Sequence, residues 1–169
     1  MNENDFARSI FEKLSPHFHI HKQIHGRHFS GKQMIIDAIV QPKDNSEWKN
    51  PEVALGIEFK DDLRIRGDTT NYTRWLAQYV DYSHTEWDNF GYIYIFACPS
   101  LIEGIPGVNV GEMAWLLPRI MGHLGIGELK HDSWRGLTFF IQERHRIWSQ
   151  KSGVESGKQY NLKRRFGSR

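Results

Sequence analysis

The stretch that decides the fold is residues 53–60, which read VALGIEFK. Val, Leu, Ile and Phe alternate with Ala, Gly, Glu and Lys, and a period of two residues is the pattern of a β-strand. This alternation places Glu58 and Lys60 on the same face of the strand. Because an unpaired charge is costly to desolvate, two charged groups in so apolar a segment are candidates for chemistry.

A second strand is predicted upstream, at residues 33–41, which read QMIIDAIVQ. The run is almost continuously apolar, which is typical of a central strand buried on both faces, and it carries Asp37. Before it, apolar residues at helical spacing predict a helix over residues 5–14. Residues 17–28 alternate loosely and predict another strand, which a turn at Ser30-Gly31 follows.

The downstream half continues the alternation of helices and strands. A helix is predicted over residues 69–82, with a third buried strand at 90–98, a helix at 111–124 and a hairpin made of 126–131 and 136–147. Strands before and after a crossover helix indicate an α/β fold with a mixed central sheet and helices on its faces. We expect one domain over residues 1–150, with a core at about 5–99, additions at 109–148, and a basic tail at 151–169.

Composition excludes several classes of protein. Of the 169 residues, 39% are hydrophobic and 13% aromatic, so the chain can build a core and is not disordered. The single cysteine excludes an internal disulfide framework, a four-thiolate zinc site and an iron–sulfur cluster. No apolar run is long enough to span a membrane, and we expect a soluble, cytoplasmic protein with no membrane partner.

Charge gives a weaker signal about partners. The formal net charge of +2 is too small to indicate a polyanionic partner by itself. Residues 158–169, however, contain five Lys or Arg and no acid, with two aromatic residues interleaved. Such a tail is either an arm that contacts phosphates or a solvated terminus.

The strongest chemical pattern is the pair of carboxylates on neighbouring strands. Asp37 and Glu58, with Lys60 two residues beyond, would suit a divalent-metal site, because Mg²⁺ prefers carboxylate oxygens. A metal can polarise a phosphoryl oxygen and activate a water molecule, while a lysine orients the water or stabilises the developing charge. The alternative is an Asp at a strand end beside a Glu–Lys ion pair.

The order of these residues resembles the PD-(D/E)XK nuclease superfamily. Ile36-Asp37 is followed about twenty positions later by Glu58-Phe59-Lys60 and then by a helix. The flanking elements resemble the αβββαβ core of restriction-endonuclease-like proteins. Gln78 and Tyr82 fit the QxxxY pattern of RecB-type members, and a Holliday-junction resolvase-like protein is a second possibility. One departure is Ile36, which stands where many members have proline.

The resemblance implies roles for particular residues. Asp37, Glu58 and the main-chain carbonyl of Phe59 would bind Mg²⁺ or Mn²⁺. Lys60 would be the catalytic lysine, with Gln78 and Tyr82 positioning it or the substrate phosphate. Resolvase-like relatives add a glutamate from the first helix. Glu12 is expected to point to solvent, so Glu3 is the better candidate here if that helix extends so far.

We therefore expect a metal-dependent deoxyribonuclease, with endo- or exonucleolytic cutting left open. RNA is an alternative substrate, and a homodimer is expected by analogy with resolvase and restriction-type relatives. The residues predicted to contact nucleic acid are Arg64, Arg66, Arg74, Lys163, Arg164 and Arg165. The competing hypotheses are a nucleic-acid-binding module on the same fold that does not cleave, and a structural α/β protein in which the charged residues form an ion pair.

Overall fold

The computed structural model describes residues 2–60, 69–100 and 113–164. Its centre is one nine-stranded sheet in the order β4-β1-β2-β3-β5-β6-β7-β8-β9. Strands β3, β5 and β6 run parallel to one another, and the remaining neighbours are antiparallel. The elements are α1 (Glu3–Leu14), β1 (Phe18–His28), β2 (Gln33–Pro42), β3 (Leu55–Phe59), α3 (Thr69–Ser83), β4 (Thr85–Trp87), β5 (Tyr94–Cys98), α4 (Met113–His123), β6 (Ile126–Asp132), β7 (Gly136–Ile141), β8 (His145–Ser149), β9 (Gly153–Val154) and the 3₁₀ helix η1 (Ser156–Lys158).

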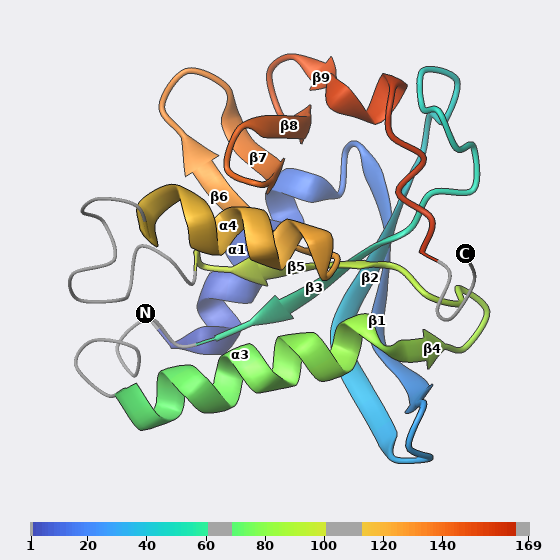
Figure 1. Cartoon of the computed structure of the whole chain (residues 1–169). Helices are drawn as coiled ribbons and strands as arrows, with labels where there is room; N and C mark the ends of the chain where they lie inside the picture. Colours follow the sequence, from blue (N-terminus) through green and yellow to red (C-terminus); the bar gives the residue numbers. More distant parts are fainter. Residues whose placement is uncertain (1, 61–68, 101–112, 165–169) are drawn as a thin grey trace.

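Helices cover both faces of this sheet, which gives the molecule two apolar clusters (Figure 1). On one face α1 packs through Ile10 and Leu14, and on the other face α3 packs through Tyr79 and Tyr82, with α4 beside it. A mixed sheet with helices on both faces confirms the predicted α/β class. No described helix is both long and apolar enough to cross a membrane.

Strand β3 lies at the centre of the fold, and all five of its residues are buried. Leu55, Ile57 and Phe59 belong to the cluster under α1. Gly56 points the other way, where an added Cβ would meet Ile36 and Ile95 of the cluster under α3. The predicted alternation is confirmed, and it directs Glu58 toward α3.

Strand β2 is buried on both faces over only part of its length, so the prediction for residues 33–41 is half wrong. Ile35 is 46% exposed, whereas Ala38, Ile39 and Val40 are fully buried. The reason is the length of the neighbouring strand, because β3 pairs only with residues 38–40. Beyond that point β2 pairs with β1 alone among the described strands, and β1 pairs in turn with β4 over Gly26–His28.

The predicted second strand of the C-terminal hairpin is two strands, β7 and β8. They are joined by a turn in which Gln142 and Glu143 have φ values of 55° and 60°. Glycine or asparagine usually marks such left-handed positions, and neither occurs at these two, so the sequence carried no turn signal. The short edge strand β4 was also missed, and the strand predicted at 90–98 is shorter, beginning at Tyr94.

The C-terminal segment packs against the fold as far as residue 164. Leu162 is 5% exposed, and Lys49 donates a backbone hydrogen bond to Gly157 at 2.9 Å. Lys163 forms an isolated bridge with Ile93, just before β5. Residues 151–164 are therefore part of the folded body, and the rest of the predicted basic tail lies outside the described residues.

Candidate active site

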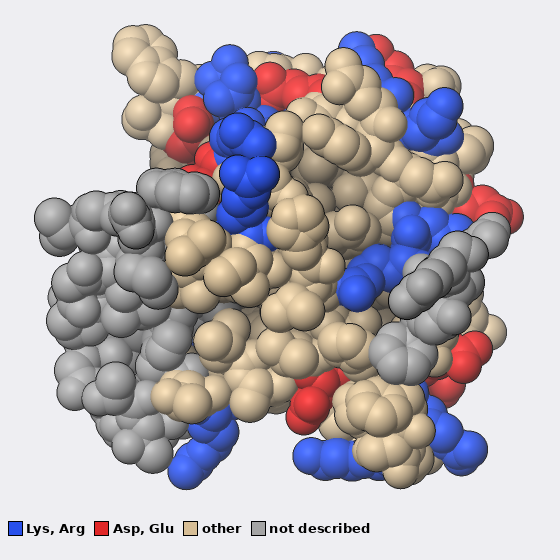
Figure 2. Space-filling model, in the orientation of Figure 1, with Lys and Arg blue, Asp and Glu red and all other residues tan. Residues whose placement is uncertain are grey.

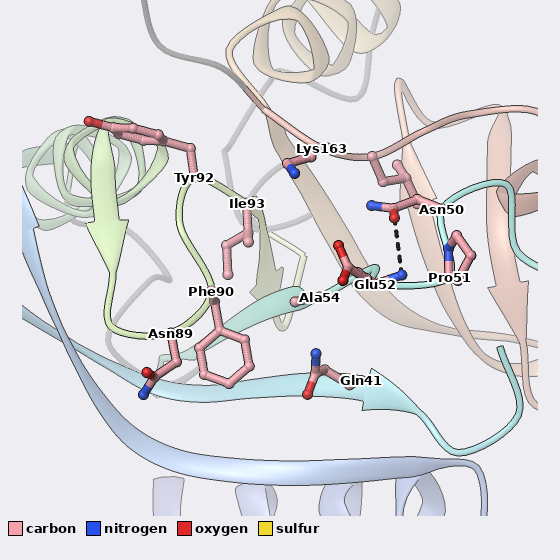
Figure 3. A pocket seen from close by; sticks show the side chains of 11 residues that line it. Gln41, Asn50, Pro51, Glu52, Ala54, Asn89, Phe90, Tyr92, Ile93 and Lys163 are labelled. Carbon is pink, nitrogen blue, oxygen red and sulfur yellow. Dashed lines mark hydrogen bonds between the residues drawn. The ribbon is translucent and has the colours of Figure 1, made fainter.

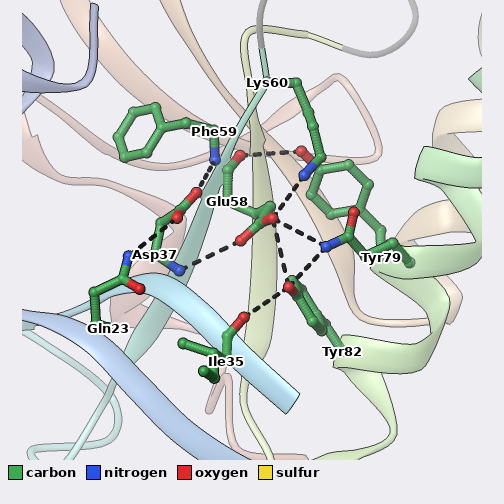
Figure 4. Close-up of polar contacts among 9 residues, drawn as sticks. Gln23, Ile35, Asp37, Glu58, Phe59, Lys60, Tyr79 and Tyr82 are labelled. Atoms are coloured by element: carbon green, nitrogen blue, oxygen red, sulfur yellow. Dashed lines mark hydrogen bonds and ion pairs between the residues drawn. The ribbon is translucent and has the colours of Figure 1, made fainter. Parts of the chain in front are cut away.

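The candidate site lies where β2 and β3 separate (Figure 4). The last ladder pair is Ala38 with Ile57. Beyond this pair, the main-chain N–H groups donate to carboxylate side chains instead of to main-chain carbonyls. Phe59 N donates to Asp37 Oδ2 at 2.8 Å, and Asp37 N donates to Glu58 Oε2 at 3.3 Å. The two carboxylates predicted from the sequence are therefore adjacent, and each is held by the main chain of the opposite strand.

Glu58 is the centre of a polar network that α3 completes. Lys60 Nζ lies 2.7 Å from Glu58 Oε1, and Gln78 Nε2 donates to the same oxygen at 3.1 Å. Gln78 also donates to the hydroxyl of Tyr82 at 2.7 Å, and that hydroxyl donates to the carbonyl of Ile35 at 2.7 Å. Gln78 and Tyr82 are four residues apart, so both project from one side of the helix. The structure thus brings together all five residues predicted as catalytic.

The electrostatic environment of Glu58 is unusual for a carboxyl group. Burial raises its pKa from 4.5 to about 7; the ammonium of Lys60 opposes this rise, and the charge of Asp37 adds to it. Burial, followed by the charge of Glu58, also raises the pKa of Tyr82 and of Tyr79. The two tyrosines therefore remain neutral at physiological pH, and Glu58 titrates near neutrality.

Asp37 reaches solvent through a cleft of about 390 Å³ between α1 and the β1–β2 pair. The sheet side of the cleft contributes Gln23, Asp37 and Phe59, and the helix side contributes Glu3, Ala7, Arg8 and Phe11. The helix is fixed there because the rings of Phe6 and Phe11 meet the ring of Phe59 edge-on. Glu3 is the carboxylate predicted to join the site if the first helix reaches it. The helix α1 does begin at Glu3.

The donor set fits a hard divalent cation. Asp37 Oδ1 has one contact among the described residues, with Gln23 Nε2 at 3.3 Å, and Glu58 Oε2 has one, with Asp37 N at 3.3 Å. These two oxygens therefore retain lone pairs, which is the chemistry that Mg²⁺ and Mn²⁺ require. Within the described ranges, however, no three His, Cys, Asp or Glu side chains already form a group that could hold a metal.

Of the residues predicted to contact nucleic acid, the three that are described do not form one group. Lys163 and Arg164 lie beside the amino end of β5, whereas Glu58 is level with Ala97 near the carboxyl end of that strand. The Arg164 guanidinium packs over the ring of Tyr94 at 5.8 Å, and one of its nitrogens is buried, so it does not extend toward a ligand at Asp37. Arg74 is exposed on α3. Arg64, Arg66 and Arg165 lie outside the described residues.

On the side of the molecule that Figure 2 shows, surface charge does not single out a binding face. Lys and Arg side chains form separate groups there, with acidic side chains among them. The β1–β2 face of the cleft adds Lys22, whose ammonium lies 4.6 Å from the centre of the Phe11 ring. Together with Arg8 it places two cations in the cleft that Asp37 lines, and neither was singled out from the sequence.

A cavity of about 410 Å³ lies elsewhere, near the amino ends of β3 and β5 (Figure 3). Its lining includes Gln41, Asn50, Glu52 and Lys163. Glu52 and Lys163 are exposed to water, whereas Glu58 is buried. We therefore regard the place where β2 and β3 separate, beyond the pair Ala38 and Ile57, as the better candidate for chemistry. We call this place the β2–β3 fork.

Gln23 is a site residue that sequence reasoning missed. Ladder pairs on either side of it, Lys22 with Ala38 and Ile24 with Ile36, place it opposite Asp37. A signal existed, because the predicted turn at Ser30-Gly31 sets the register of the two strands, and that register determines which residues face each other.

No protein-family model, curated protein or solved structure matches this chain. The function is therefore inferred from the site itself.

Proposed function

We propose that this protein is a metal-dependent nuclease that hydrolyses phosphodiester bonds in DNA. The observation that carries the proposal is the meeting of Asp37, Glu58 and Lys60 at the β2–β3 fork. Two carboxylates with open lone pairs, one of which lines a cleft, and a partly buried lysine form a set suited to phosphoryl chemistry.

Each residue has a role that its contacts support. Asp37, Glu58 and the carbonyl of Phe59 would hold Mg²⁺ or Mn²⁺. Such an ion, when bound, supplies charge that polarises a phosphoryl oxygen and acidifies a water molecule. Lys60, only 14% exposed, would stabilise negative charge that develops on the phosphate. Gln78 and Tyr82 hold the Glu58 carboxylate in place.

Membership of the PD-(D/E)XK superfamily is part of the same proposal. The element order α1-β1-β2-β3-α3-β5 matches the expected αβββαβ core once the short β4 is set aside. The acidic residues lie on the second and third strands, and the QxxxY residues lie on the following helix. This arrangement supports the proposal because both motifs converge on Glu58.

A cleavage panel tests the proposal. Supercoiled plasmid, linear duplex, single-stranded DNA, a four-way junction and RNA are incubated with the protein in Mg²⁺, Mn²⁺ or Ca²⁺. We expect cleavage of DNA in Mg²⁺ or Mn²⁺ and binding without cleavage in Ca²⁺. Asp37→Asn preserves an acceptor for Phe59 N but removes the charge, and it should abolish cleavage. Cleavage that survives both Asp37→Asn and Lys60→Met would exclude this site.

A second candidate is a nucleic-acid-binding module without catalysis. It is favoured by the fact that Glu58 Oε1 is already occupied by Lys60 and Gln78, so the network is stable without an ion. Retained DNA binding, with no cleavage on any substrate in either metal, would support this interpretation. Size-exclusion chromatography with light scattering on the same samples tests the expected homodimer.

A further inference from the structure

Gln23 has a backbone conformation that is rare inside a β-strand. Its φ angle is 52°, and it lies near the middle of the eleven-residue strand β1. The other described non-glycine residues with positive φ, Asn89, Gln142, Glu143 and Leu162, lie outside the strands. For a residue with a Cβ this conformation is strained, and such strain persists only where the surrounding structure maintains it.

At the strained residue, both strands of the β1–β2 hairpin change the side of the sheet on which their alternate apolar residues pack. In β1, Phe18 and Ile20 pack in the cluster under α1, whereas Ile24 packs under α3. In β2, Val40 lies under α1 and Ile36 under α3. Residues an even number apart share a face in a regular strand, so each strand must rotate between these positions.

The rotation falls at the pair formed by Gln23 and Asp37. It allows Asp37 to line the cleft under α1 although it lies within the body of the sheet. Gln23 lines the same cleft, and its amide Nε2 donates to Asp37 Oδ1 at 3.3 Å. The second oxygen, Oδ2, accepts from Phe59 N at 2.8 Å, so the carboxylate is held at both oxygens.

We infer that Gln23 is a positioning residue for Asp37, and this inference rests on the proposed function of the site. Its backbone directs Asp37 into the cleft, and its amide fixes the rotation of the carboxylate. Groups that orient a metal-binding side chain typically change metal affinity 10- to 100-fold when they are removed. We therefore expect the loss of the Gln23 amide to raise the Mg²⁺ concentration needed for half-maximal cleavage by about tenfold.

Four variants separate the side chain from the backbone strain. Gln23→Ala removes the amide and keeps the strain, whereas Gln23→Gly removes both. Gln142 provides the matched control, since it is a glutamine with φ of 55° in the β7–β8 turn. Glycine adopts positive φ without strain, so each Gly variant should melt at a higher temperature than the corresponding Ala variant.

We expect the Mg²⁺ concentration needed for half-maximal cleavage to depend on whether the Gln23 amide is present and not on the melting temperature of the variant. Both Gln23 variants should need more Mg²⁺, and both Gln142 variants should behave as wild type. A wild-type Mg²⁺ requirement in Gln23→Gly, with a defect only in Gln23→Ala, would show that the defect follows the backbone strain and not the loss of the amide, and it would overturn the inference. So would a wild-type requirement in both Gln23 variants.

A metal-free measurement keeps this test independent of the proposed nuclease activity. The amide proton of Phe59 donates to Asp37, and its hydrogen exchange reports how firmly that carboxylate is held. We expect faster exchange in Gln23→Ala and Gln23→Gly and no change in the Gln142 variants. If wild-type protein neither cleaves DNA nor binds Mn²⁺, the proposed function fails, yet faster exchange still supports the positioning role. Unchanged exchange contradicts it.

Discussion

Asp37 and Glu58 each accept a hydrogen bond from the peptide N–H of the opposite strand: Phe59 N binds Asp37, and Asp37 N binds Glu58. The positions of both carboxylates are thereby set by the main chain where β2 and β3 separate. Preorganised groups of this kind are what catalysis by charge stabilisation requires, because they need no rearrangement when the reaction occurs.

The raised pKa of Glu58 predicts a pH dependence of stability in the metal-free protein. The folded protein holds the Glu58 proton up to about pH 7, whereas the unfolded chain releases it near pH 4.5. The folded state thus binds more protons over this window, so this residue lowers the free energy of unfolding as pH rises from 4.5 to about 7. Above that window the contribution is constant.

Urea unfolding of wild type and Glu58→Gln in chelator, at a series of pH values, measures this effect. We expect the stability of wild type relative to Glu58→Gln to decline through the window and then level off. A pH-independent difference would show that the Glu58 pKa is not raised.

Lys60 and Lys130 form a matched pair for testing catalysis. Each follows a buried glutamate by two residues, and their side chains are 14% and 16% exposed. Only Lys60 contacts the carboxylate pair at the β2–β3 fork. Lys60→Met should lower the cleavage rate by about 10²- to 10³-fold, and Lys130→Met should leave the rate near wild type. Single-turnover cleavage of a labelled duplex measures both, and equal losses would remove the specific role of Lys60.

Tyr79 and Tyr82 allow a similar comparison on α3. Tyr82 bonds Gln78 and Ile35 beside the Glu58 carboxylate, whereas Tyr79 donates to the main-chain carbonyl of Glu58 at 3.0 Å. Loss of the Tyr79 hydroxyl leaves the buried carbonyl of Glu58 unsatisfied and should lower stability by about 1–3 kcal/mol. Loss of the Tyr82 hydroxyl should cost less, because its partners are only partly buried. We expect Tyr82→Phe alone to reduce cleavage at a temperature where both variants are folded. A comparable reduction in Tyr79→Phe would mean that the effect arises from stability.

Gly127 tests the close packing of β6 against its antiparallel neighbour β7. A Cβ at this position would lie 2.4 Å from the carbonyl oxygen of Phe140, which is main chain and cannot move easily. At Gly56 the closest atoms are 2.8 Å away and are the flexible ends of Ile36 and Ile95. Gly127→Ala should therefore destabilise the protein by about 3 kcal/mol, and Gly56→Ala by less. Thermal melts of the two variants compare them directly, and the reverse order would contradict this packing.

The two cations of the α1 cleft predict a salt-dependent contribution to DNA binding. Arg8 and Lys22 line the cleft with Asp37, whereas Lys13 of the same helix does not. Changing Arg8 and Lys22 to Ala should reduce the slope of log affinity against log salt by about 0.9 for each phosphate that these cations neutralise in the wild type. Fluorescence anisotropy with labelled DNA in Ca²⁺ measures the slope. Lys13→Ala should leave it unchanged, and an equal change in that variant would argue against the cleft.

Much of the central fold was predictable because the patterns are local. The alternation in residues 53–60 identified β3 and its two faces, and the helical spacing in residues 69–82 identified α3. The convergence of Asp37, Glu58, Lys60, Gln78 and Tyr82 was expected from the family resemblance that their order along the chain carries, and the structure does bring them together. These features depend on side-chain period and element order, which the sequence displays directly.

The missed features depend on tertiary geometry or on unusual backbone angles. The exposure of Ile35 follows from where β3 stops pairing, and the β7–β8 turn uses left-handed Gln142 and Glu143 in place of glycine. The packing of Arg164 on Tyr94 depends on the bridge between Lys163 and Ile93, a contact between distant parts of the chain that no local pattern marks. The strain at Gln23 is invisible in the sequence because glutamine is ordinary in a strand.

The burial of β3 on both faces determines which parts of the site can adapt. Moving Glu58 or Phe59 would disturb the pairing of three strands, so the floor of the site is rigid. Lys60 and Gln78, by contrast, are joined to it by long side chains that can swing aside without breaking a ladder bond. A bound phosphate would therefore be accommodated by rotamer changes at the rim, on the timescale of side-chain motion and without any hinge in the sheet.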